Sequence, residues 1–166
     1  MATLFVTAYH AILIRWLSIA AAVFALDRLT KHWAVEAMQP YQPVPVAPFL
    51  NLTLVYNPGA AFSLLSDAGG WQRWFFAGFS ALVALLLLVW LYRLPRDQVW
   101  VPIAFSLILG GALGNLWDRL AIGFVVDFID VYYGQWHWPA FNVADAAIST
   151  GAIMLLLGAL RPVPKQ

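Results

Sequence analysis

Cysteine is absent from this chain of 166 residues, and charged side chains are scarce. The missing cysteine excludes disulfides, thiol catalysis and metal sites built on thiolates. Only 10% of the residues are charged, whereas a typical soluble domain has about 25%. The formal net charge of +1 provides no basic stripe for nucleic acid. With 63% hydrophobic residues, the composition predicts an integral membrane protein with a single domain, residues 1–166.

Two common kinds of catalytic site are also missing from the sequence. The histidines, His10, His32 and His137, lie in no recognisable nucleophile–base arrangement with a serine. No zinc motif with paired histidines occurs, and a site for a hard cation normally has more carboxylates or a phosphate substrate. We therefore expect neither a metal nor a cofactor.

Long apolar runs are what the sequence has in abundance. A transmembrane helix needs roughly 20 mainly apolar residues, and four segments meet this requirement, at about 16–35, 74–92, 99–119 and 142–160. The first has an alanine-rich stretch like a signal-peptide cleavage site, but its length and charged continuation favour a retained helix. Five Lys and Arg flank the side of the termini and four flank the other side. By this small margin, the termini are expected in the cytoplasm.

Two connecting segments, residues 39–73 and 120–141, are expected outside the membrane. Within the first, Phe49–Tyr56 alternates with period two, which predicts a strand. Within the second, Val125–Tyr133 is rich in β-branched and aromatic residues, which predicts another strand. The two strands would form a small sheet at the level of the lipid headgroups.

Seven of the eight acidic side chains lie toward these external segments, and Asp97 alone lies on the side of the termini. Asp127 stands in an apolar run, and Asp145 opens the last apolar segment. An ionisable group at membrane depth is costly, so such residues usually have a function. Two close carboxylates cannot both ionise cheaply, so one keeps a proton while the other accepts one from water. The pair predicts a carboxylate dyad that activates water for hydrolysis.

Other polar residues allow more than one interpretation. Asp27 and Lys31, four residues apart on one helix, would form an ion pair that lowers the cost of insertion, or would contribute to the site. Asp118 and Arg119 would form a local network at a helix end, or Arg119 would hold a substrate carbonyl. Asp130 competes with Asp127 and would point to the opposite face of the strand. A proton-coupled transporter and a structural subunit are the alternative functions, although a transport path needs polar groups near the midplane.

Five short motifs occur in order along the chain. They are Asp27–Lys31, Asn57–Ser63, Gly114–Arg119, Val125–Asp130 and Phe141–Asp145. In order and spacing they resemble the motifs of lipoprotein signal peptidase (signal peptidase II), a family of bacterial inner-membrane aspartyl proteases. The resemblance covers residues from about 15 to 160.

The resemblance implies an all-α membrane protein with four transmembrane helices, cytoplasmic termini and a small periplasmic β-cradle, in the bacterial inner membrane. It implies an aspartic endopeptidase that removes signal peptides from diacylglyceryl-modified prolipoproteins on the amino side of the lipidated cysteine. Membrane lipid and globomycin-type cyclic peptide inhibitors would be further partners. Asp127 and Asp145 would form the catalytic dyad at the periplasmic face. The supporting residues would be Asp27, Lys31, Asn57, Gly59, Asn115, Asp118, Arg119 and Asn142.

Overall fold

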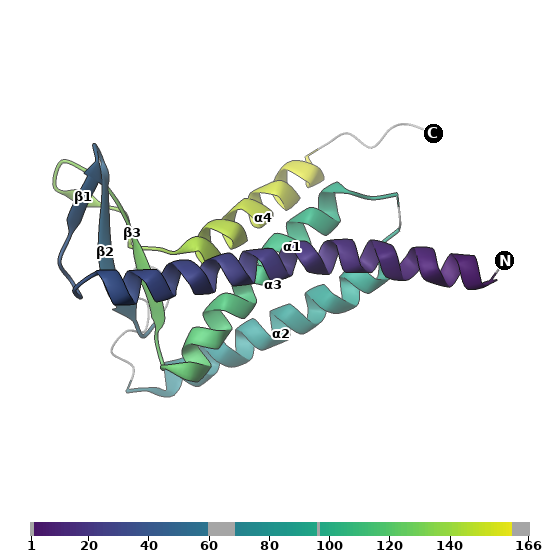
Figure 1. The fold of residues 1–166 in the computed structure, drawn as a ribbon, viewed down its shortest axis with the longest axis horizontal. Helices are drawn as coiled ribbons and strands as arrows, with labels where there is room; N and C mark the ends of the chain where they lie inside the picture. The colour runs from purple at the N-terminus through teal and green to yellow at the C-terminus, as the bar shows by residue number, and fades with distance from the viewer. Residues whose placement is uncertain (1, 60–68, 96, 161–166) are drawn as a thin grey trace.

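The structure, a computed structural model, describes residues 2–59, 69–95 and 97–160. Its helices are α1 (Ala2–Ala37), α2 (Trp71–Arg93), α3 (Trp100–Ala121) and α4 (Val143–Ala159). They form an elongated bundle with a small sheet at one end, and the start of α1 and the end of α4 lie toward the other end (Figure 1). Residues 60–68, which include the end of the motif that begins at Asn57, lie outside the described residues.

Helix α1 begins much earlier in the chain than expected, at Ala2 instead of near residue 16. The predicted range covers only the apolar segment, whereas the helix continues through Arg15 toward the N-terminus. Neither proline nor glycine occurs between residues 2 and 37, and the helix ends shortly before Pro40. The other three helices agree with the predicted ranges to within three residues at each end.

Helix α3 is the centre of the bundle and contacts α1, α2 and α4. A Cβ added to Gly110 would lie 2.5 Å from the carbonyl oxygen of Ala20 on α1, and one added to Gly111 would collide with the carbonyl of Ala144 on α4. Small residues let helix backbones approach this closely. The glycines of α3 thus serve helix packing.

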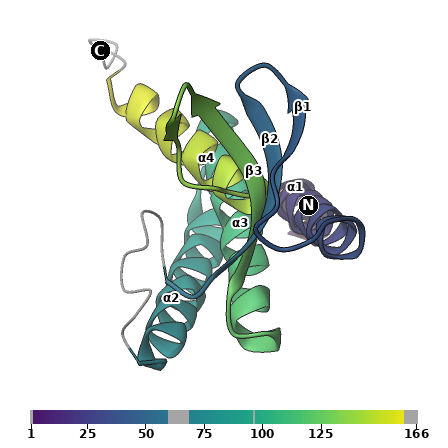
Figure 2. The same ribbon diagram turned by 90° about the vertical axis from the view of Figure 1, so that its left-hand side faces the viewer.

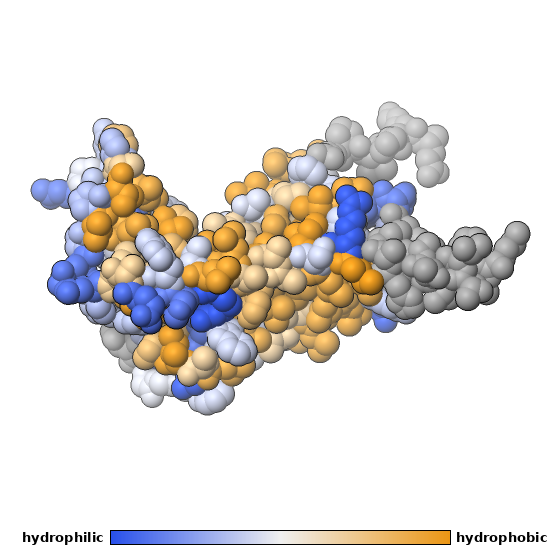
Figure 3. All heavy atoms as spheres, in the orientation of Figure 1, coloured by the Kyte–Doolittle hydropathy of each residue, from blue (hydrophilic) through white to orange (hydrophobic). Residues whose placement is uncertain are grey.

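The outer surface of the bundle is apolar. Figure 3 shows hydrophobic residues over the helical part and hydrophilic residues gathered around the sheet end. Helices α2 and α3 are long and apolar enough to cross a membrane, while α4 is a shorter apolar helix. Large side chains exposed on α2 include Trp74, Phe75, Phe79, Leu82, Leu85, Leu86, Leu88 and Val89. This surface suits a membrane protein.

The sheet contains β1 (Val44–Ala47), β2 (Leu50–Asn57), β3 (Val125–Tyr133) and β4 (Trp136–His137), antiparallel in that order. Strands β2 and β3 are the two predicted ones, and Figure 2 shows them side by side above the helix ends. Strands β1 and β4 were missed, because β1 contains Pro45 and β4 has only two residues. The sheet packs on α1 through a buried cluster of Ala34, Leu54, Val126 and Phe128, which fixes β3 over the bundle.

Candidate active site

The two predicted dyad residues meet where β3 crosses the start of α4. Asp127 lies in β3 and is only 2% exposed, and Asp145 is the third residue of α4. Asn142 connects them: its side-chain Nδ2 donates to Asp127 Oδ1 at 2.7 Å, and its backbone N–H donates to Asp145 Oδ2 at 3.2 Å. Both carboxylates line one cavity of about 460 Å³, which we call the inner cavity.

Asn142 holds this position because it caps α4. Its Oδ1 accepts the backbone N–H of Asp145 at 2.9 Å while the Asp145 carboxylate accepts the N–H of Asn142, a reciprocal capping box. The Asn-x-x-Asp sequence therefore determines the local geometry. It places the Asp145 carboxylate at the helix N-terminus, where the helix dipole favours a negative charge.

Asn57, Gly59 and Arg119 form a second chain of contacts to the dyad. Asn57 Nδ2 donates to Asp127 Oδ2 at 3.1 Å, and Asn57 Oδ1 accepts the backbone N–H of Gly59 at 3.0 Å. The Gly59 carbonyl accepts Arg119 Nη2 at 2.9 Å. The guanidinium also lies over the ring of Phe76, 5.2 Å from its centroid. Its buried Nε has no hydrogen-bond partner among the described residues, and Arg119 lines the inner cavity.

Asn115 connects the other carboxylate to a buried lysine. Its Nδ2 donates to Asp145 Oδ1 at 2.8 Å, and its Oδ1 accepts Lys31 Nζ at 2.9 Å. Because an ammonium group only donates, Lys31 fixes which end of the amide is the oxygen. The Asn115 NH₂ group must then face Asp145.

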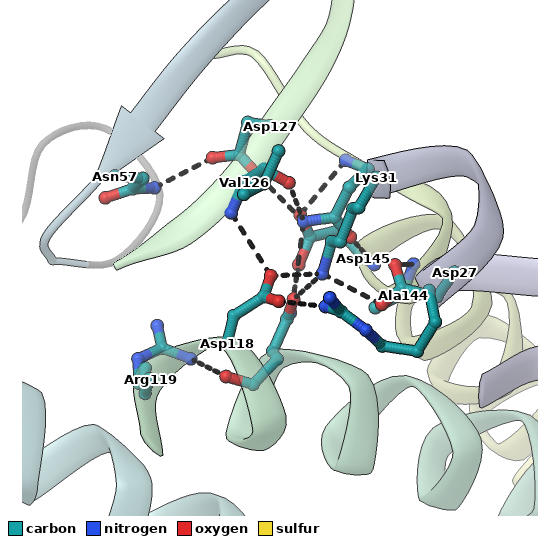
Figure 4. A network of polar contacts seen from close by, with 12 residues as sticks. Asp27, Lys31, Asn57, Asp118, Arg119, Val126, Asp127, Ala144 and Asp145 are labelled. Carbon is teal, nitrogen blue, oxygen red and sulfur yellow. Dashed lines mark hydrogen bonds and ion pairs between the residues drawn. The ribbon is translucent and has the colours of Figure 1, made fainter. Parts of the chain in front are cut away.

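Lys31 also belongs to a buried ion network, shown in Figure 4. Its Nζ lies 2.9 Å from Asp27 and 2.8 Å from Asp118, and Arg28 forms an ion pair with Asp118. Asp27 accepts the backbone N–H of Ala144 at 3.0 Å, which adds a second cap to α4. Asp27 and Lys31 thus form the expected intrahelical pair, and Lys31 also contacts Asn115, which donates to Asp145.

The local network expected between Asp118 and Arg119 is wrong. The Asp118 carboxylate turns to Arg28, Lys31 and the backbone N–H of Val126, while Arg119 turns to Asn115 and Gly59. Neighbours in a helix point in directions about 100° apart, so they rarely pair. Sequence reasoning also missed Arg28 as a partner, although it stands inside the first motif.

The electrostatics of the site raise the proton affinity of Asp127. Burial and the nearby Asp145 together raise the pKa of Asp127 to about 7. Two acids and two cations balance in the ion network of Asp27, Asp118, Lys31 and Arg28. Buried charges are tolerated when they are paired in this way.

Asp130 differs from Asp127 in all its partners. Its carboxylate contacts Asn51 and Thr53 at 3.2 Å each, and His137 at 2.8 Å. Burial raises the pKa of Asp130, but these hydrogen bonds outweigh it and hold the pKa below its usual value. Both carboxylates nevertheless line a second cavity. The pairing of β2 with β3 shifts register between Leu52 and Val55.

Residues 2–59, 69–95 and 97–160 contain no group of three or more His, Asp or Glu side chains placed to hold an ion. The carboxylates of the site are instead occupied by amides, a lysine and an arginine.

Comparison with known proteins gives one consistent result. The profile of the family described as signal peptidase (SPase) II matches residues 19–161. The lipoprotein signal peptidase of Pseudoalteromonas atlantica is 56% identical over 144 residues, which cover 87% of this chain and 88% of that protein. That of Acinetobacter baumannii (strain SDF) is 56% identical over 142 residues, 86% and 81% of the two chains. That of Yersinia pseudotuberculosis is 48% identical over 154 residues, 92% and 91% of the two chains.

Solved structures agree with the sequence relatives. A bacterial membrane enzyme determined by the in meso method at 2.3 Å resolution has a TM-score of 0.81 and 31% identity, covering 92% of this chain and 93% of that one. A second such structure, at 1.9 Å, has a TM-score of 0.78 and the same 31% identity, covering 90% and 94%. On these matches the chain belongs to the signal peptidase II family, a family of aspartic proteases.

Proposed function

We propose that this protein removes the signal peptide from diacylglyceryl-modified prolipoproteins, and that Asp127 and Asp145 carry out the hydrolysis. The single observation that carries the proposal is that both carboxylates line one cavity while Asn142 hydrogen-bonds to each of them. Cleavage falls on the amino side of the lipidated cysteine. The names of the relatives support this substrate class.

In the mechanism that we propose, Asp145 is the base and Asp127 the acid. Ionised Asp145 accepts a proton from a water molecule, whose oxygen attacks the carbonyl carbon of the scissile bond. Protonated Asp127 donates to the carbonyl oxygen as its negative charge develops. When the tetrahedral intermediate collapses, the carbonyl oxygen returns its proton to Asp127, and Asp145 gives its proton to the departing amine. The dyad regains its single proton after each turnover.

The supporting residues favour Asp145 as the base and Asp127 as the acid. The Asn115 amide and the N-terminus of α4 stabilise a negative charge on Asp145. Asn57 and Asn142 hold the carboxyl group of Asp127 in place. Arg119 offers its unpaired Nε to a backbone carbonyl of the substrate, because a guanidinium has several donors in fixed directions.

The membrane arrangement belongs to the same proposal. All four helices span the bacterial inner membrane as one domain, with cytoplasmic termini and the sheet as a periplasmic cradle. The hydrophilic residues around the sheet end support a position of the sheet outside the apolar core of the membrane (Figure 3). The acyl chains of the substrate would stay in the outer leaflet while its scissile bond reaches the dyad. Globomycin-type cyclic peptides would occupy the inner cavity, and the reaction uses no metal or cofactor.

The direct test incubates the purified protein with a diacylglyceryl precursor and follows release of the signal peptide. Asp127→Asn and Asp145→Asn should each lower kcat by at least about 10²- to 10⁴-fold, because each removes one partner of the proton transfer. Asp97→Asn is the matched control, because Asp97 is exposed in the loop between α2 and α3. Wild-type turnover by either dyad variant would eliminate the assignment.

A further inference from the structure

A second cavity of about 410 Å³ continues from the inner cavity on the side of the sheet. We call it the outer cavity. The two cavities share Asn57, Asp127 and residues 138–140, whereas Asp145 lines only the inner one. Asp127 therefore lies at the junction of the two cavities. A substrate polypeptide that passes the Asp127 carboxyl group would extend from one cavity into the other.

The two cavities differ in the elements that line them. The two ends of a precursor also differ, because the signal peptide is apolar and the chain after the scissile bond is polar. The inner cavity extends along α4 to Ile148 and Ser149, next to the apolar surface of the bundle. The outer cavity is lined by β2, β3 and the segment 137–140, with no helical residue among its lining. An apolar signal peptide suits the former, and the polar chain that follows the scissile bond suits the latter.

His137 is the polar side chain of the outer cavity that is best placed to bind a ligand. Its Nδ1 contacts Asp130 at 2.8 Å, and its ring stacks on Tyr132 with centroids 5.3 Å apart. Asn51 and Thr53 hold the carboxylate of Asp130 from the other side. Half of the His137 side chain is nevertheless exposed. Because Nδ1–H donates to Asp130, Nε2 is available for a ligand. It can accept a hydrogen bond from a backbone N–H, or donate one to a carbonyl when the ring is protonated.

We propose that the outer cavity holds the residues that follow the lipidated cysteine as an extended polypeptide, and that His137 Nε2 hydrogen-bonds to their backbone. Asp130 is then a positioning residue that keeps the imidazole in one orientation. This inference rests on the proposed function, because it assigns the scissile bond to Asp127. The inference predicts that the enzyme distinguishes precursors by the number of residues after the cysteine. Their side chains should matter little, because the hydrogen bonds are made to the backbone.

The test compares two diacylglyceryl precursors with the same signal peptide. One continues for four residues after the cysteine, and the other ends at the cysteine as its amide. Wild-type kcat/KM should be higher for the long precursor. His137→Ala should lower the long-to-short ratio of kcat/KM by about three- to tenfold, the effect of one hydrogen bond. Asp130→Asn should shift the ratio in the same direction, mainly through KM.

His32→Ala is the matched control, because His32 is exposed on α1 and lines neither cavity, and its ratio should equal that of the wild type. An unchanged ratio in His137→Ala would overturn the inference while leaving the dyad intact. Asp127→Asn should lose cleavage of both the long and the short precursor, a result that reports on the dyad alone. Failure of the outer-cavity inference is therefore distinguishable from failure of the proposed function.

A second measurement is independent of turnover and of the folding of His137 variants. A precursor with a photoreactive residue two positions after the cysteine is bound to Asp127→Asn and irradiated. Cross-links to His137, or to Thr53, Val55 or Tyr56 of β2, are expected, because these residues line only the outer cavity. Cross-links confined to α4 around Ile148 would place that part of the substrate in the inner cavity and overturn the inference.

Discussion

Asn142 is the single residue on which the geometry of the site depends most. It is fully buried, caps α4 and hydrogen-bonds to both carboxylates of the dyad. An alanine in its place would remove the cap and also the donor to Asp127. Its two roles can be separated, because serine is as good an N-cap as asparagine but has a shorter side chain.

We predict that Asn142→Ala lowers the free energy of unfolding by about 0.5–2 kcal/mol, the usual loss of an N-cap, and also lowers kcat. Asn142→Ser should regain most of this stability without regaining the activity, because its hydroxyl does not reach Asp127. Thermal unfolding in detergent and cleavage of a diacylglyceryl precursor measure the two effects. Full activity in Asn142→Ser would show that the bond to Asp127 is dispensable.

The candidate residues could be named from the sequence, but their partners could not. The motif around Asp145 contains its own cap, so Asn142 and Asp145 were predictable as a local unit. The contact between Lys31 and Asn115 joins positions 84 apart in the chain, and that between Arg28 and Asp118 joins positions 90 apart. Such pairs depend on how α1 packs against α3, which no local pattern specifies.

At the scale of the elements, close packing around α3 sets the position of the site. Gly110 faces Ala20 and Val23 on α1, and a Cβ on Gly114 would collide with the carboxylate of Asp27. A larger residue at either position would move α3 away from α1. The Asn115 amide, which α3 carries, would then shift relative to Lys31.

We predict that Gly110→Ala lowers the free energy of unfolding by about 1–3 kcal/mol, the usual cost of overpacking. Its Cβ would lie 2.5 Å from the backbone oxygen of Ala20, and backbone cannot give way as a flexible side chain can. Gly78→Ala on α2 is the control, since nothing lies within 4 Å of its Cβ, and it should be neutral or slightly stabilising. Equal melting temperatures for the two variants would contradict the packing role.

The elements themselves were predictable where their pattern is long. The four apolar segments and the strands β2 and β3 follow from hydrophobic periodicity and β-branched content. Strand β1 exists only because β2 pairs with it, and its Pro45 argued against a strand in the sequence. The shift in register between Leu52 and Val55 is not indicated by any pattern in the sequence.

For the whole molecule, the decisive property is which side of the membrane the sheet faces. Since the chain has no cysteine, single cysteines report on topology without interference. Gln135 is exposed in the turn between β3 and β4, and Gln98 is exposed in the loop between α2 and α3. The turn between β3 and β4 and the loop between α2 and α3 lie at opposite ends of the bundle (Figure 1).

We predict that an impermeant maleimide added to spheroplasts labels Gln135→Cys but not Gln98→Cys. After lysis both should be labelled. Activity of each variant on a lipidated precursor serves as the folding control. The reverse pattern would place the site in the cytoplasm, and labelling of both before lysis would contradict a spanning bundle.

The pH dependence of kcat/KM tests the central claim of a dyad with one proton most directly. Because burial and Asp145 raise the pKa of Asp127 to about 7, Asp127 is mostly protonated at pH 6 and loses its proton as the pH rises. With both carboxylates ionised, no acid remains for the scissile carbonyl. We predict that kcat/KM on a diacylglyceryl precursor falls on the order of tenfold per pH unit above this pKa. A kcat/KM that stays constant or rises between about pH 7 and pH 9, where it is predicted to fall, would contradict the account.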